Sequence, residues 1–226
     1  MELVARRPIV RAANLAKLRA IGFAPVDWFP LREHRAVVRP TEEIAHRTLA
    51  LAALWAWAAL SEADLRSSVL VAHIERNGLR AAMTSLEREL LEHARGSLSN
   101  EVALLLDATA ALAWTLTFAS EPALSLPEGR GISPSEGALR DLLRFALRGG
   151  DVRTSDLASR TRSDREIVEH EDLFACAHQT ARLALLGHPE ARVPSDASWS
   201  GIEASRHALT WCLSPGETWE SVDLST

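Results

Sequence analysis

Apolar side chains along this chain recur every three to four residues, which is the spacing of a helix with one face in a core. Alternation with period two, the pattern of half-buried strands, is nearly absent. The pattern therefore predicts an all-α fold of about eight helices around one core. The clearest helical segments are 7–21, 42–60, 61–77, 100–119, 169–187 and 201–213.

Polar residues at the segment boundaries predict where helices begin. Thr41 precedes Glu42 and Glu43, and such an order is typical of a helix start, because a hydroxyl caps free N–H groups and carboxylates favour the positive end of the dipole. Four more starts have the pattern of a capping box, with Glu three residues after Ser or Thr. They are Thr84/Glu87, Ser133/Glu136, Ser163/Glu166 and Ser200/Glu203.

The domain organisation follows from length and from one stretch of distinct composition. We interpret residues 1–226 as a single helical domain, since 226 residues suffice for one large core. Residues 120–137 are rich in Pro, Gly and Ser and are a candidate linker between two lobes.

Composition narrows the class of protein. The net charge is −5, which disfavours nucleic acid and anionic membranes as partners, because dedicated binders of both carry a basic excess. The two cysteines, Cys176 and Cys212, are too few for a disulfide framework. The apolar run at 49–60 is too short to span a bilayer, and Asp107 interrupts the run at 102–119. We therefore predict a cytoplasmic protein without a membrane span.

Motifs for metal binding or covalent catalysis are incomplete. Glu43 and His46 form one Glu-x-x-His, whereas di-iron bundles need two such motifs and two further glutamates. Cys176 and His178 lie two residues apart and point to different helix faces. No phosphate-binding loop and no nucleophile motif is found. We predict no metal and no cofactor, and interpret the stripe of His170, Phe174 and His178 as packing residues.

Five charged residues form the candidate polar cluster: Glu43, Arg47, Asp107, Arg206 and Asp223. Asp107 lies on a helix that is apolar on every face, and Arg206 lies on the apolar stripe of 201–213. Arg47 is one turn from Glu43 and could pair with it. Buried charges are costly unless they are paired, so we expect Asp107, Glu43 or Asp223 to pair with Arg206 or Arg47. Such a cluster is either a structural ion network or a pocket with a perturbed carboxylate.

The C-terminal segment RHALTWCLSPGETWESVDLST, 206–226, carries Trp211 and Trp219 on either side of a turn at 214–216. Together with RPTEEIAHRTLAL at 39–51, DATAALAWTLTFASEP at 107–122 and EIVEHEDLFACAHQTARLALLG at 166–187, it resembles, in order, four segments of the bacterial domain-of-unknown-function family four-two-seven-two. Thr218, Glu220 and Ser225 stand where that family carries Asp.

The resemblance implies a mostly helical bacterial protein and no established reaction. It also implies that the tail is a recurring element, which we interpret as a strap whose Trp211 and Trp219 dock on the helical core. The sequence favours a non-catalytic cytosolic domain that binds another protein, in an accessory, immunity or defence role, and a homo-oligomer is compatible with it. The alternative is a small-molecule-binding protein or enzyme that uses the polar cluster.

Overall fold

The structure is a computed structural model that describes residues 2–28, 37–92, 99–117, 119, 122, 124, 137, 140–143 and 161–224. In these ranges the chain forms eight helical elements with defined bounds and only an isolated β-bridge, which confirms the all-α class. The chain divides into two compact units. Most of the candidate linker 120–137 lies outside the described residues, so the linker and the single domain stay predictions.

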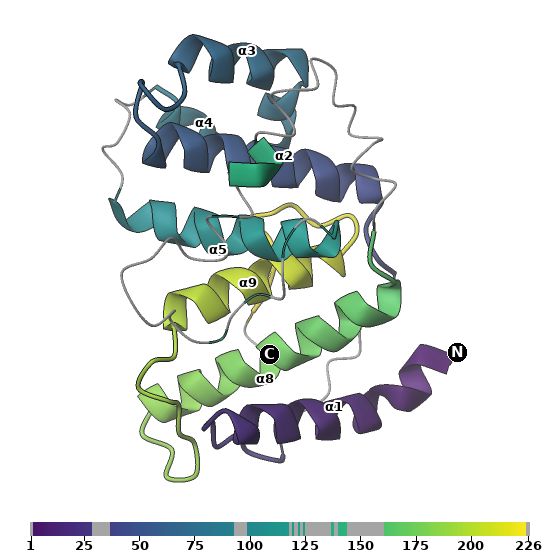
Figure 1. Cartoon of the computed structure of the whole chain (residues 1–226). Helices are drawn as coiled ribbons and strands as arrows, with labels where there is room; N and C mark the ends of the chain where they lie inside the picture. The colour runs from purple at the N-terminus through teal and green to yellow at the C-terminus, as the bar shows by residue number, and fades with distance from the viewer. Residues whose placement is uncertain are drawn as a thin grey trace. The chain divides into compact units, whose positions relative to one another are not determined.

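The first unit contains three long helices. Its central helix α8 contacts both of the others and lies between them (Figure 1). The fully buried side chains of Leu18, Phe174 and Leu209, one from each helix, form part of its core. The helices are α1 (Glu2–Ala20), α8 (Asp164–Leu185) and α9 (Trp199–Cys212).

The second unit is built around a helix that is apolar on nearly every side. This helix, α2, packs against α5, α3 and η1, and Trp55 near its end is almost fully buried (Figure 1). A helix that is apolar all round belongs in the middle of a core, and α2 lies there. The elements are α2 (Thr41–Ala59), α3 (Ser67–Arg76), η1 (Leu79–Ala82), α4 (Ser85–Leu90) and α5 (Ser99–Thr115).

Two of the four predicted capping boxes are confirmed, Thr84/Glu87 at α4 and Ser163/Glu166 at α8. In each, the hydroxyl accepts a hydrogen bond from the Glu backbone N–H, and the Glu carboxylate accepts one from the backbone of the capping residue. Both helices therefore begin where the local sequence predicts.

The predicted capping box at Ser200/Glu203 is wrong. α9 begins at Trp199, and the hydroxyl of Ser198 accepts a hydrogen bond from Gly201 N at 3.1 Å. A serine two residues earlier occupies the cap, so Ser200 is already inside the helix. The predicted box at Ser133/Glu136 lies outside the described residues.

Two further helix starts differ from prediction. Thr41 is the first residue of α2, and the cap position is Pro40, which makes no side-chain cap. The helix predicted from Ser61 begins only at Ser67, whose backbone N–H donates to the Glu62 carboxylate at 2.9 Å. Polar groups near Ser61 thus satisfy one another in a turn, which removes the advantage of starting a helix there.

Candidate functional site

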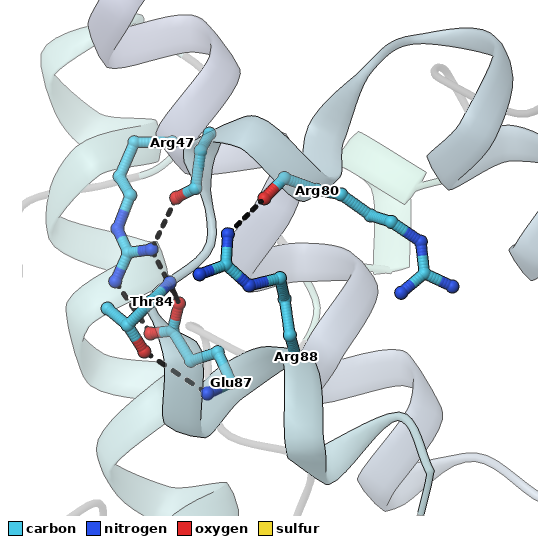
Figure 2. A network of polar contacts seen from close by, with 6 residues as sticks. Arg47, Arg80, Thr84, Glu87 and Arg88 are labelled. Atoms are coloured by element: carbon cyan, nitrogen blue, oxygen red, sulfur yellow. Dashed lines mark hydrogen bonds and ion pairs between the residues drawn. The ribbon is translucent and has the colours of Figure 1, made fainter.

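A buried charged contact of the second unit joins Arg47 of α2 to Glu87 of α4 (Figure 2). The two terminal guanidinium nitrogens donate to the two carboxylate oxygens at 2.6 Å each, and Arg47 Nη1 also donates to Ala82 O at 2.6 Å. Arg47 is only 2% exposed and Glu87 8%. This is a bidentate, desolvated ion pair, the strongest geometry available to an arginine.

Glu87 has a second role in the same place. Its Oε2 accepts the Thr84 backbone N–H at 2.9 Å, while the Thr84 hydroxyl accepts the Glu87 N–H at 3.1 Å (Figure 2). One carboxylate therefore closes the capping box of α4 and neutralises a buried arginine of α2. Because its oxygens are already occupied by these donors, we interpret the contact as a clamp between helices.

The ion pair predicted between Glu43 and Arg47 is not formed. Glu43 is exposed and accepts a hydrogen bond from Arg39 at 2.8 Å, one turn before it. Arg47 instead pairs with Glu87, which lies 40 positions further along the chain. Burial explains the choice, because the Arg47 side chain is buried whereas Glu43 of the same helix is exposed.

Asp107 lies half-buried on α5, less enclosed than predicted. Its burial raises the pKa of the carboxyl to about 6. An arginine counter-charge would have lowered this pKa. Among the described residues Arg47 pairs with Glu87 and no ion pair of Asp107 is seen, so the fold disfavours the charged form of the Asp107 carboxylate.

We predict that Asp107→Asn stabilises the protein at neutral pH. The unfolded pKa is near 3.9 and the folded value about 6, so the cost of the charge grows from pH 4 to 6 and stays constant above. With the remaining solvent contact, the gain at pH 7.5 should be about 1–2 kcal/mol and should shrink towards pH 4. Urea unfolding of both proteins at several pH values measures it. A less stable variant at pH 7.5 would mean that Asp107 has a buried counter-charge.

The remaining two predicted cluster residues, Arg206 and Asp223, belong to the first unit. Arg206 is fully buried on α9, as predicted, and donates to Nδ1 of His178 on α8. Burial and nearby arginines lower the pKa of His178 to about 4, so the ring is neutral at pH 7 and its Nδ1 can accept. Asp223 lies exposed in the tail, and its pairing with Arg206 stays a prediction.

The tail after α9 folds back onto that helix. The ring of Trp219 packs edge-on against His207 and Trp211, with centroids 4.5 and 5.5 Å apart. Near the end of the described chain, Leu224 O accepts a hydrogen bond from Arg206 at 3.1 Å. The predicted turn at 214–216 is present, with Gly216 at a φ of 93°. These are the contacts through which a strap would act.

Sequence reasoning missed two carboxylates of α8 that contact neighbouring helices, the buried Glu171 and the partly buried Asp172. Asp172 accepts hydrogen bonds from Arg11 Nε at 2.8 Å and from Asn14 at 2.9 Å, both on α1. Glu171 is 4% exposed and accepts from the Thr210 hydroxyl on α9 at 3.0 Å. Adjacent residues of one helix thus face two different neighbours. The available signal was that Glu171 and Asp172 come directly before the apolar run at 173–177.

The cysteine and histidine side chains of α8 are buried, and His178 in addition accepts the hydrogen bond of Arg206. His170, Phe174 and His178 are all buried, as their shared stripe predicts. Cys176 and Cys212 are buried thiols, and burial raises the pKa of the Cys176 thiol to about 12, which makes it a poor nucleophile. Across the described ranges, no group of three or more His, Cys, Asp or Glu side chains could hold a metal ion.

Exposed apolar side chains gather at one end of the first unit, where α1 and α8 both finish. Ala24 and Arg192 join the two following loops through backbone hydrogen bonds of 2.9 and 3.3 Å, and the rings of Trp28 and His188 lie 6.0 Å apart. We call this region the apolar end surface. Its members are Ile21 (52% exposed), Trp28 (58%), Leu185 (73%), Leu186 (74%) and Val193 (37%).

Both helices that carry this surface end in the same fixed geometry. Gly22 after α1 and Gly187 after α8 take left-handed φ values of 94° and 77°, which only glycine adopts without strain. In each case the next N–H returns to a carbonyl five residues back, forming a Schellman motif. The return bonds are Phe23 N to Leu18 O at 3.0 Å and His188 N to Leu183 O at 2.9 Å. The apolar end surface is therefore held by ordered backbone.

These elements define an all-α protein with arginines buried in contacts between helices. Residues 11–222 match the profile of the family described as "Domain of unknown function (DUF4272)", so the chain belongs to this family, and the resemblance noted in its sequence is confirmed. Comparison with curated proteins and with solved structures found no match. No helix in the described ranges is both long and apolar enough to cross a membrane.

Proposed function

We propose that this protein acts as a non-catalytic interaction domain that binds a protein partner through the apolar end surface. The observation that carries the proposal is the exposure of Leu185, Leu186 and Trp28 together at one end of a compact unit. Large exposed apolar patches are costly for solubility and typically mark interaction sites. Aromatic side chains such as Trp28 are frequent anchors of such sites.

The buried polar groups give less support to the alternative, an enzyme or a small-molecule pocket. Arg47 and Glu87 occupy each other and a helix cap, and Asp172 is held by Arg11 and Asn14. These contacts resemble structural ion pairs more than groups held ready for a substrate. The raised pKa of Asp107 favours the alternative.

The proposal is tested by capture of a tagged chain at low salt from the cells that produce it, with bound molecules identified by native mass spectrometry. We expect the wild type to retain a stoichiometric protein, and Leu185→Ser/Leu186→Ser to lose it. The matched control is Leu86→Ser, because Leu86 is 70% exposed on α4 of the other unit. Retention of the same protein by the double variant would contradict the proposal. A bound small molecule without a protein would favour the alternative.

A further inference from the structure

We propose that the partner of the apolar end surface is a second copy of this chain, so that the protein forms a two-fold symmetric dimer. This inference rests on the proposed function, because it names the occupant of the same surface. It draws on three properties of that surface, namely its area, its charge and its rigidity.

The area of the surface matches what a symmetric contact requires. At the observed exposures, its five side chains leave roughly 500–600 Å² of apolar area in water, the upper end of what ordinary monomers show. Two such surfaces placed together would bury about 1,000–1,200 Å², the lower limit of specific interfaces. A symmetric dimer brings the same patch from both copies and thereby covers all of it.

The charges around the surface favour self-association over a strongly charged partner. The exposed charged residues in 17–28 and 182–196 are Lys17, Arg19, Arg182 and Arg192, and Asp27, Glu190 and Asp196. Both signs are therefore present in nearly equal number. In a two-fold symmetric contact, the surface of one copy faces the same surface of the other copy. Charges of a single sign around that surface would repel each other, whereas charges of both signs can pair across the symmetry axis.

The backbone beneath the surface is ordered before any partner arrives. Two Schellman motifs end α1 and α8, and the Ala24–Arg192 bridge joins their loops. Association then needs little new order in the backbone at 18–24 and 183–192, which lowers the entropic cost of a modest interface. From these properties we expect a dimer with a dissociation constant in the micromolar range.

Sedimentation velocity of the purified full-length chain, over a dilution series through the micromolar range, tests the inference. We expect the wild type and Leu86→Ser to dimerise, and Trp28→Ala and Leu185→Ser/Leu186→Ser each to weaken dimerisation by at least about 10-fold. All replaced side chains are more than half exposed, so unchanged circular dichroism should accompany the loss. A second readout is the amount of mixed dimer formed by two differently tagged copies, which the variants should lower to the same extent.

The outcomes separate this inference from the proposed function. A wild type that is monomeric at the highest concentration, or a dimer that the variants leave intact, would overturn the inference. If the monomer nevertheless captures a different protein from cells and loses it in Leu185→Ser/Leu186→Ser, the proposed function stands with another partner. If neither contact depends on these residues, both proposals fail.

Discussion

Replacing Glu87 by alanine should lower the free energy of unfolding by about 3–5 kcal/mol, the range found when one partner of a buried ion pair is removed. The variant leaves Arg47 as a charge that is 2% exposed and removes both of its hydrogen bonds to the Glu87 carboxylate, which Figure 2 shows, while the bond to Ala82 O remains. It also removes the carboxylate that closes the Thr84 capping box. Urea unfolding followed by circular dichroism measures the loss.

Two controls divide this loss between the cap and the ion pair. Thr84→Ala removes the hydroxyl of the cap and keeps the Arg47–Glu87 pair, so it should cost only about 1 kcal/mol. The double variant Arg47→Met/Glu87→Leu removes both charges and should recover much of the stability, because well-packed apolar residues often replace buried pairs without loss. If Glu87→Ala lowered the free energy of unfolding no more than Thr84→Ala does, the ion pair between Arg47 and Glu87 would not stabilise the fold.

Removing residues 214–226 should destabilise the protein by about 2–3 kcal/mol, through lost aromatic burial and a lost hydrogen bond to a charged group. The truncation takes away Trp219, which covers Trp211 and His207 on α9. It also removes Leu224 O, the backbone acceptor of the fully buried Arg206. Thermal unfolding of the truncated and full-length chains measures the effect.

A milder variant shows which part of the tail matters. Trp219→Ala keeps the backbone acceptor for Arg206 and removes only the ring, so it should account for about half of the loss. Glu217→Ala is a suitable control, because that side chain is exposed in the turn. A truncated chain as stable as the full-length protein would refute the strap that we inferred from the sequence.

The helices were predictable because their signals are local. Periodicity places α2, α8 and α9 close to their observed positions, and the boxes at Thr84 and Ser163 mark two helix starts correctly. Both kinds of signal act within one or two turns, so they can be read from a single stretch of sequence. Errors arose where two hydroxyls compete for one helix cap, as those of Ser198 and Ser200 do. Either serine can cap a helix, and only the folded backbone shows which one does.

The inward direction of Arg47 and Arg206 was also predictable, since each lies on an apolar stripe of its own helix. Their contacts were not. Arg47 meets Glu87 and Arg206 meets His178, and these residues lie 40 and 28 positions away along the chain. A helical pattern shows which residues share a face, but it does not show which other face will be packed against it.

Tertiary structure was likewise needed to recognise the apolar end surface. In sequence, Leu185 and Leu186 are the last apolar residues of a helix, and Ile21 and Trp28 belong to a separate segment more than 150 positions away. Helical periodicity specified the helices and their buried faces, because it depends on neighbours within a turn. Only the packing of α1 beside α8 brings the two ends together and leaves them in water, because burial depends on every element that lies nearby.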